Sequence, residues 1–219
     1  IHFGMPILNP STVQDYIDFG LKGIAMSRYS GCWVGMKCVT DTVESAASVD
    51  ISLERFKPNL PPASDNLEEV HLQWGFIPAA SETRLFQRKL PAAKEFAKHN
   101  SIDRVIFQGK KKLAIITSGK AYLDVRQALD ELGLTEKKCK EIGISLYKVG
   151  MVWPLEPDNI LDFVDGHSEV LVIEEKRPII EDQLIKYLFN KANRPIIIGK
   201  NDENGDDLIP SDGELSPSL

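Results

Sequence analysis

The chain has 219 residues, enough for one large domain or two small ones, and its 42% hydrophobic and 26% charged residues are ordinary for a globular protein. A net charge of −6 argues against a general nucleic-acid binder, which carries an excess of lysine and arginine. No apolar run approaches the roughly 20 residues that span a bilayer, and the first residues lack the pattern of a secretory signal. We therefore expect a cytoplasmic protein with neither nucleic acid nor membrane as a partner.

Residues 1–56 predict the end of an α/β domain whose earlier strands are missing. Ser11 followed by Gln14 has the spacing of a capping box, which predicts the start of a helix. The apolar stripe of this helix is expected to comprise four residues at helical spacing: Val13, Ile17, Leu21 and Ile24.

Residues 32–39 then have the pattern of a strand, and residues 40–49 that of a short helix or turn. One helix with one or two strands does not make a self-sufficient core. The chain also begins at Ile1 inside an apolar run and ends at Leu219 in a polar stretch. We expect both ends to be cuts through a longer polypeptide.

Residues 57–105 predict a linker followed by an arm helix. The first part is polar and contains four prolines: Pro58, Pro61, Pro62 and Pro78. From Pro91 to about Arg104 the pattern is that of an amphipathic helix, with Ala93, Phe96 and Ala97 on one side.

Residues 106–219 predict an open, parallel, doubly wound α/β domain. Four apolar runs have the character of strands covered on both faces: 113–116, 144–149, 170–173 and 195–198. Helical patterns alternate with them: one ends near Gly133, one covers 157–164, and one begins at Pro178. This alternation favours parallel strands with right-handed crossovers, and the tail from Asn201 is expected to be irregular.

Cysteine and histidine supply no metal-ligand pattern. Cys32, Cys38 and Cys139 form no C-x-x-C pair, and an odd, sparse number of cysteines suits a reducing compartment. Cys32 and Cys38 have the same parity within one expected strand, so we interpret these two as small buried hydrophobic residues. An iron–sulfur cluster within this chain is not expected, because it needs about four thiolates. The histidines have no ligand spacing and are interpreted as ordinary residues: His2, His71, His99 and His167.

Three turns that follow strands carry the candidate contacts. Ser118, Gly119 and Lys120 lie between a strand and a helix start, where backbone N–H groups and a lysine can bind a phosphate or carboxylate. Neither the P-loop pattern nor G-x-G-x-x-G is present, and a plain tight turn with a solvated lysine is the alternative.

The second and third turns favour contacts between domains. Glu174 is followed by Glu175, Lys176 and Arg177, a cluster of mixed sign that favours an interdomain salt-bridge patch over proton transfer. Trp153 is apolar where loops are usually polar, which indicates a packing plug or a contact for another domain. Parallel topology predicts that all three turns meet at one edge of the sheet. No residue is predicted to be catalytic.

Two sets of segments carry a family resemblance: residues 4–8 and 13–18 with SRYSGCWVGMK at 27–37, and GKAYLDVRQAL at 119–129 with GELSP at 213–217. The first set resembles the end of the pyrimidine-binding domain of the indolepyruvate ferredoxin oxidoreductases, and the second resembles the start and end of their transketolase C-terminal-like domain. Nearly the whole chain resembles this family of 2-oxoacid:ferredoxin oxidoreductases, and the long fused bacterial type in particular.

The resemblance implies a parent enzyme that uses thiamine diphosphate, Mg²⁺ and iron–sulfur clusters to convert a 2-oxoacid to an acyl-CoA. Its partners would be ferredoxin, coenzyme A and its own other domains, in a homo-oligomer. The Gly-Asp-Gly magnesium motif is missing here, and the activating glutamate precedes Ile1, so we expect this portion to be non-catalytic and to bind no cofactor alone. The alternative is a stand-alone anion- or nucleotide-binding α/β module that uses the turn at 118–120.

Overall fold

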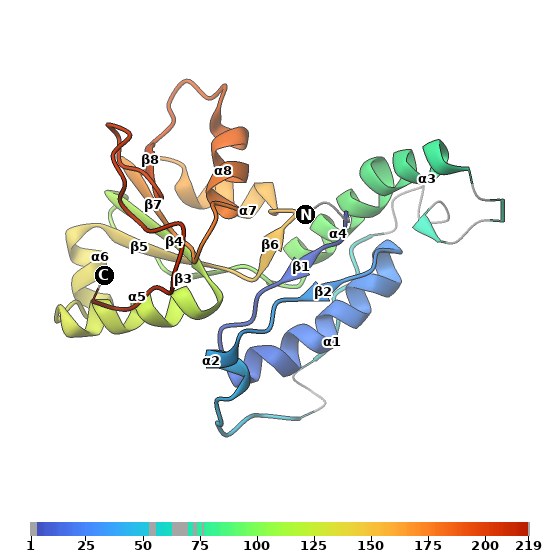
Figure 1. Ribbon diagram of the computed structural model, residues 1–219, viewed down its shortest axis with the longest axis horizontal. Coiled ribbons are helices and arrows are strands. Elements are labelled where there is room, and N and C mark those ends of the chain that lie inside the picture. The colour runs from blue at the N-terminus through green and yellow to red at the C-terminus, as the bar shows by residue number, and fades with distance from the viewer. Residues whose placement is uncertain (1–3, 53–55, 63–69, 72–73, 76, 219) are drawn as a thin grey trace. The chain divides into compact units, whose positions relative to one another are not determined.

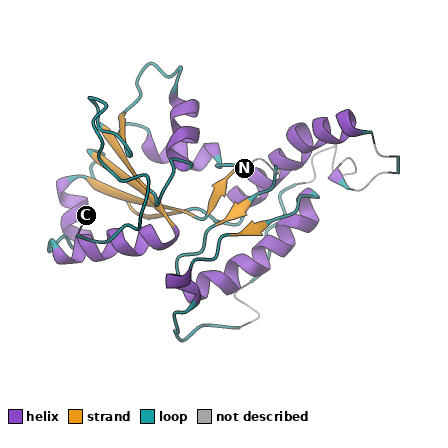
Figure 2. Cartoon of the chain, viewed as in Figure 1, coloured by secondary structure: helices purple, strands orange, loops and turns teal. Residues whose placement is uncertain are grey.

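A computed structural model describes residues 4–52, 56–62, 70–71, 74–75 and 77–218 of the chain. The chain forms two compact units. The first comprises Ile1–Ile102 with Met151–Glu156, and the second comprises Asp103–Gly150 with Pro157–Leu219. Figure 2 shows that both units contain helices as well as strands.

The second unit is built on a five-stranded sheet with the order β3-β5-β4-β7-β8. Its strands are β3 (Arg104–Phe107), β4 (Leu113–Ser118), β5 (Ile144–Val149), β7 (Glu169–Ile173) and β8 (Ile196–Ile198). The last four are parallel, with Ile116 of β4 in register with Tyr147 of β5 and Val172 of β7. The prediction of a parallel α/β sheet is therefore confirmed for all four predicted strands.

Helices cover both faces of this sheet. They are α5 (Gly119–Glu131), α6 (Glu136–Ile142), α7 (Pro157–Val164) and α8 (Ile180–Leu188), and Figure 1 shows α5 and α6 on the side of the sheet opposite α7 and α8. A buried cluster joins α5 and α6 to one face: Phe107, Ile115, Val125, Leu129, Cys139 and Leu146. On the other face Tyr147 lies 4.9 Å from Phe163 of α7, measured between ring centroids. Burial on both faces explains why the central strands are continuous apolar runs.

Three details of this unit differ from the prediction. The edge strand β3 pairs antiparallel with β5 and was not predicted, because its first two residues are exposed. Helix α6 was not predicted, because Cys139 is its only buried residue. Helix α8 begins at Ile180 rather than at Pro178, since the carboxylate of Glu174 accepts the N–H groups of Ile180 and Glu181.

The first unit contains a small sheet with the order β2-β1-β6. β1 (Ile7–Leu8) and β2 (Gly35–Met36) are parallel and are joined by α1 (Val13–Ser30), whereas β6 (Met151–Trp153) is antiparallel to β1. β2 is much shorter than the predicted strand at 32–39. A short helix α2 (Thr40–Val43) follows it.

Residues 78–99 form a continuous helical segment: α3 (Pro78–Arg84), a π-helical turn η3 (Leu85–Lys89) and α4 (Leu90–His99). Pro91 lacks an N–H and crowds the preceding turn, so wider turns before it relieve the clash. The predicted arm helix therefore ends five residues earlier than Arg104. The predicted apolar side of the arm helix, Ala93, Phe96 and Ala97, is buried in the core of the first unit.

The position of residues 151–156 was also wrong in the prediction, which placed them in a loop of the second domain. They form β6 and belong to the first unit. The side chain of Met151 is completely buried there and packs in the same cluster as Leu8. No observation tests the identification of residues 1–56 with a pyrimidine-binding domain, which stays a prediction.

The capping box of α1 lies one residue later than predicted. The Thr12 hydroxyl accepts the N–H of Asp15 at 3.2 Å, and the Asp15 carboxylate accepts the N–H of Thr12 at 3.2 Å. The same carboxylate also accepts the N–H of Ser11 at 3.0 Å. The Asp15 carboxylate therefore accepts two N–H groups before the helix, those of Ser11 and Thr12, and this explains why Asp15 rather than Gln14 completes the capping box.

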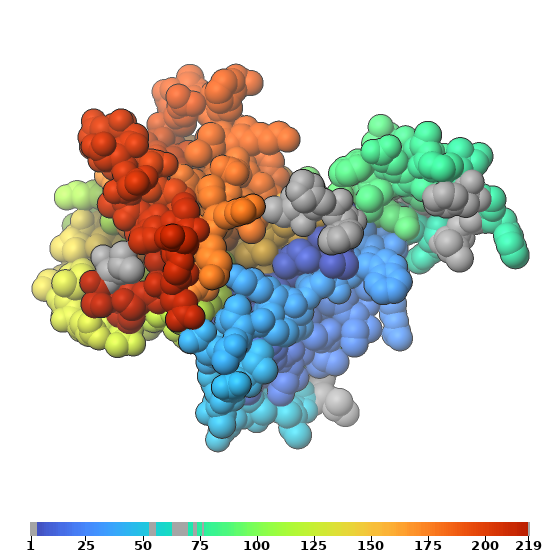
Figure 3. Space-filling model, viewed as in Figure 1, coloured from blue at the N-terminus to red at the C-terminus, as the bar shows by residue number. Residues whose placement is uncertain are grey.

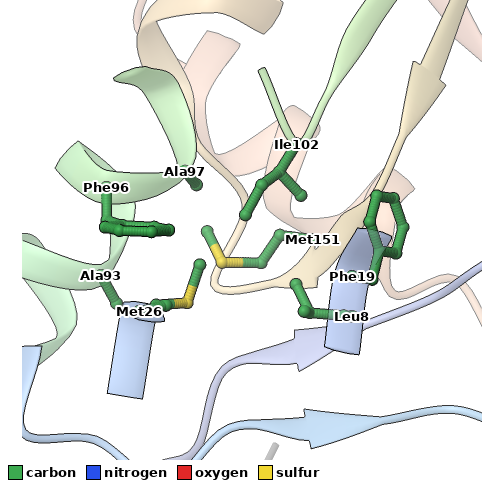
Figure 4. Packing of buried hydrophobic residues seen from close by; sticks show 8 residues of the cluster. All are labelled: Leu8, Phe19, Met26, Ala93, Phe96, Ala97, Ile102 and Met151. Atoms are coloured by element: carbon green, nitrogen blue, oxygen red, sulfur yellow. The ribbon is translucent and has the colours of Figure 1, made fainter. Parts of the chain in front are cut away.

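The predicted apolar stripe of α1 is not its buried face. Leu21 and Ile24 are 43% and 55% exposed, whereas Phe19, Gly23 and Met26 are buried. Phe19 and Met26 belong to a cluster that joins α1, α4 and two strands, shown in Figure 4: Leu8, Phe19, Met26, Ala93, Phe96, Ala97, Ile102 and Met151. The helix has apolar residues on more than one side, and packing against α4 selects among them.

Replacing Phe19 with alanine should lower the free energy of unfolding by about 3–5 kcal/mol, because it leaves a cavity in this cluster. Leu21→Ala on the same helix should cost less than about 1 kcal/mol, since Leu21 is already exposed to water. Urea denaturation followed by circular dichroism measures both values. Equal losses would contradict the assignment of the buried face.

Candidate functional site

The carboxyl edge of the sheet in the second unit holds two of the three predicted turns. Ser118 ends β4, and Glu174 follows β7, whose Ile173 is in register with Thr117. Because the two strands are parallel neighbours, their turns lie at the same edge. Trp153 lies in β6 of the first unit, so this sheet does not bring it to that edge.

Lys120 is bound within its own unit. Its Nζ lies 3.0 Å from Oδ2 of Asp124 and donates to the carbonyl oxygen of Leu215 at 2.7 Å. The side chains of Lys120 and Asp124 are only 16% and 15% exposed. Ser118 is the buried N-cap residue of α5, and Gly119 has a φ of 55°, a conformation that favours glycine. This lysine therefore fixes the C-terminal segment to α5.

Glu174 is the central polar residue of the site. Its carboxylate is buried and accepts the N–H of Ile180 at 2.9 Å and the N–H of Glu181 at 3.0 Å. Burial raises the pKa of Glu174, and the N–H groups and Lys200 oppose this rise. The start of α8, where an external anion can bind, is thus capped by a carboxylate of the chain itself.

Lys200 extends this network to the C-terminal segment. Its Nζ donates to the carbonyl oxygens of Glu174 at 2.6 Å and Pro210 at 2.9 Å. Its backbone N–H donates to Oε2 of Glu181 at 2.9 Å. Burial lowers the pKa of Lys200 despite the nearby carboxylates, which raise it. Two lysines therefore hold two carbonyl groups of the segment that follows β8.

That segment has no helix or strand among its described residues, as predicted, but it is well hydrogen-bonded. Asn201 and Asp207 form an isolated bridge, and Asp202 accepts the N–H groups of Asn204 and Asp206. Leu215 is buried. Figure 3 shows the segment, in red, lying against α5, in yellow-green.

The remaining predicted contacts lie at the surface. Lys176 and Arg177 are exposed and Glu175 is half-buried, so the buried role falls to Glu174. Lys176 has a φ of 64°, which turns the chain sharply between β7 and α8. Sequence reasoning placed Glu174 in a salt-bridge patch and missed its role as a cap, although a carboxylate between a buried strand and a helix start is a recognisable signal for one.

The described residues do not fit the diphosphate–Mg²⁺ group of thiamine diphosphate. In the described part of the chain, no three His, Cys, Asp or Glu side chains are grouped to hold a metal ion. The lysines at the sheet edge bind carbonyl groups of the chain itself. Cys32 and Cys139 are buried, but Cys38 is exposed, contrary to prediction, because β2 ends before it.

The described helices include none that combines the length and apolar character needed to cross a membrane.

His167 takes part in a second buried polar group, at the opposite end of β5. Its Nε2 lies 2.8 Å from the hydroxyl of Ser145, and that hydroxyl accepts the N–H of Gly109 at 3.0 Å. The ring of His167 lies 5.4 Å from that of Phe163, between centroids. Burial lowers the pKa of His167, and the charge of Lys111 lowers it further. The hydroxyl of Ser145, on β5, thus holds both the loop of Gly109 and the loop of His167. The neutral ring of His167 therefore has a structural role.

The family model and the curated relatives that match this chain are those of indolepyruvate oxidoreductases. Residues 102–218 match the family model of the indolepyruvate ferredoxin oxidoreductase middle domain. The chain is 26% identical over 186 residues to indolepyruvate oxidoreductase subunit IorA of Methanothermobacter thermautotrophicus, which covers 83% of this chain and 28% of that protein. It is 26% identical over 224 residues to the same subunit of Pyrococcus horikoshii, covering 97% of this chain and 31% of that protein.

The chain therefore spans less than a third of the length of these relatives. A solved structure, "2-oxoglutarate:ferredoxin oxidoreductase from Magnetococcus marinus with 2-oxoglutarate, coenzyme A and succinyl-CoA bound", is similar at 17% identity and a TM-score of 0.47, covering 94% of this chain and 40% of that one. None of these comparisons tests the expected closeness to long fused bacterial enzymes, which stays a prediction.

Substitution of Glu174 by alanine should lower the free energy of unfolding by about 1–3 kcal/mol, because buried N–H groups at the start of α8 lose their acceptor. Glu174→Gln should cost less, since an amide oxygen can accept the same bonds. Glu175, the half-buried neighbour, provides the control, and Glu175→Ala should change the free energy of unfolding by less than about 0.5 kcal/mol. Similar losses for both alanine variants in urea denaturation would refute this role.

Stability should also depend on pH through His167. Its pKa is lowered in the folded state, so below about pH 6.5 the unfolded chain binds more protons than the folded one. The contribution of His167 is complete above that pH and is lost as the pH falls toward the folded-state pKa. His167→Gln should therefore weaken the loss of stability between pH 7 and pH 5, measured by urea denaturation, with exposed His71→Gln as the control. An identical pH dependence in wild type and His167→Gln would disprove this.

Proposed function

Because the chain belongs to the family of the indolepyruvate ferredoxin oxidoreductase middle domain, we propose that it is a non-catalytic structural and interface portion of a thiamine-diphosphate-dependent 2-oxoacid:ferredoxin oxidoreductase. The whole enzyme would decarboxylate an indolepyruvate-like 2-oxoacid, release its carboxyl group as CO₂, pass the electrons to ferredoxin and transfer the acyl group to coenzyme A. Thiamine diphosphate, Mg²⁺ and iron–sulfur clusters would be bound by other parts of the enzyme, a cytoplasmic homo-oligomer.

The observation that carries this proposal is that Lys120, Glu174 and Lys200, at the sheet edge described above, all bind groups of the chain itself. Lys120 and Lys200 bind carbonyl groups of the C-terminal segment, and Glu174 caps α8. In an open α/β sheet this edge is the usual place for a ligand, where polar groups would face the ligand instead of one another. Their mutual engagement supports a structural role.

Exposed side chains support the interface role. Lys176 and Arg177 extend from the turn after β7 without a described ion pair that would occupy them. In the first unit, Trp33 is 85% exposed and Trp74 is fully exposed, and aromatic side chains are enriched at interfaces between proteins. Other domains of the same enzyme are the proposed partners, since the chain matches only 28% and 31% of the length of these relatives.

A stand-alone anion- or nucleotide-binding module is not favoured by any contact at the edge. That function requires Lys120 to be available to a ligand, and its Nζ is bound to Asp124 and to the carbonyl of Leu215.

Arg177→Ala in the longer enzyme should weaken assembly by about 2–5 kcal/mol, the cost of leaving one member of an interface charge pair alone. The kcat of the assembled fraction should remain within about twofold of wild type. Sedimentation and steady-state kinetics measure the two effects. Lys140→Ala is the matched control, because Lys140 is an exposed lysine that pairs with Glu136 along its own helix.

Two results would contradict the proposal. A large fall in kcat with intact assembly and unchanged KM would place Arg177 in the catalytic machinery. Calorimetric titration of the 219-residue chain with thiamine diphosphate and Mg²⁺ should detect no sub-micromolar binding, and tight binding would mean that the chain holds the cofactor itself.

A further inference from the structure

A pocket in the first unit has no role in the function proposed above. It lies between α1 and residues 56–60 and has a volume of about 550 Å³, within the range of about 300–1,000 Å³ that small-molecule sites usually have. Its lining is mainly apolar and includes Leu21, Ile24 and Ala25 on one side and Phe56, Pro58 and Leu60 on the other.

The α1 side of this pocket contains part of the apolar stripe that the sequence predicts to be buried. Leu21 and Ile24 of that stripe are exposed, and Leu60 on the facing side is 59% exposed. Exposed apolar side chains that line a concave surface together are typical of a binding site, because a ligand there removes their surface from water.

Both sides of the pocket are fixed by contacts within the unit. Ala25 and Tyr29 pack against the buried cluster of Figure 4, with the ring of Tyr29 5.9 Å from that of Phe96, between centroids. On the other side the N–H of Asn59 donates to Oδ1 of Asn100, and Nδ2 of Asn100 donates to the carbonyl oxygen of Asn59, both at 2.8 Å. The pocket is therefore formed before a ligand enters, which lowers the entropic cost of binding.

The polar groups of the lining favour an anion. Arg28 is exposed in the last turn of α1, and no described residue forms a hydrogen bond or ion pair with its guanidinium. Tyr29 and His71 also line the pocket, and the described lining contains no carboxylate. Burial and then the charge of Glu95, which is not in the lining, raise the pKa of Tyr29, so its hydroxyl keeps its proton.

We propose that this pocket binds a small molecule with an apolar body and one carboxylate, the body lying between Leu21, Ile24 and Leu60 and the carboxylate at Arg28. A guanidinium binds a carboxylate through two parallel hydrogen bonds, and one such pair at an apolar pocket fixes the orientation of the ligand. The proposal does not depend on the function proposed above, because every residue that it uses belongs to the first unit.

Titration with 3-phenylpropionate tests the proposal, with neutral 3-phenylpropionamide as the matched control. In the 219-residue chain the acid should bind with a Kd at or below about 1 mM and at least about fivefold more tightly than the amide. It should shift the methyl NMR signals of Ala25 and Leu60 but not those of Leu132, an exposed leucine of the second unit. Equal affinity for the two probes, or equal shifts at Leu132, would overturn the proposal.

Two substitutions separate the two parts of the ligand. Arg28→Gln should weaken binding of the acid at least about fivefold and leave binding of the amide unchanged, because only the acid meets the guanidinium. Lys37→Gln is the control, since Lys37 is an exposed basic residue of the same unit outside the lining. Unchanged affinity of Arg28→Gln for the acid would contradict the proposal.

Leu60→Ala should weaken binding of both probes alike, by about threefold, because both lose the same apolar contact. Leu60 is largely exposed, so the variant should fold, and Leu132→Ala is its matched control. Unchanged affinity of Leu60→Ala for both probes would place the ligand elsewhere and overturn the proposal.

The longer enzyme distinguishes a ligand site from a surface that another part of the protein covers. Calorimetric titration of the longer enzyme with 3-phenylpropionate should show the same difference between wild type and Arg28→Gln, a comparison that cancels binding at any other site. The absence of that difference would mean that the pocket is covered there and would overturn the proposal. So would dimers of the 219-residue chain in sedimentation that Arg28→Gln dissociates, because they would assign the pocket to a second copy.

Discussion

One buried carboxylate organises the second unit. Glu174 accepts N–H groups at the start of α8, and its own carbonyl accepts the Nζ of Lys200, which also holds Pro210. A carboxylate removed from water needs such partners, because burial without them costs several kcal/mol. The start of α8, the path of the chain after β7 and the position of the C-terminal segment therefore depend on one another. Substituting any member leaves the others buried with fewer partners.

This network also bears on the function. The carboxyl edge of a parallel sheet offers helix starts and loops to a ligand, and many α/β proteins use it in that way. Here the chain's own carboxylate and carbonyl groups take those positions at α8 and beside Lys120. The edge is thus stabilised from within, which is consistent with the structural role proposed above.

In the first unit, the core and the sheet both depend on residues that are distant in the sequence. Its core includes Met151, although 48 residues of the second unit, Asp103–Gly150, separate Ile102 from it in the sequence. The antiparallel strand β6 completes one side of β1, whereas β2 on the other side remains at an edge of the described sheet. The core of the first unit therefore depends on a strand that a distant part of the chain supplies.

The sequence by itself determined the parallel sheet of the second unit and the family, and both predictions were confirmed. The strands could be recognised because burial on both faces makes a run such as Ala114–Ile116 apolar at every position, which is a local property. Only the tertiary structure decided that Phe19 rather than Leu21 is buried, that residues 151–153 form a strand of the first unit, and that Lys120 binds the carbonyl of Leu215, 95 residues away. Each depends on a partner distant in the sequence, and local periodicity carries no information about such a partner.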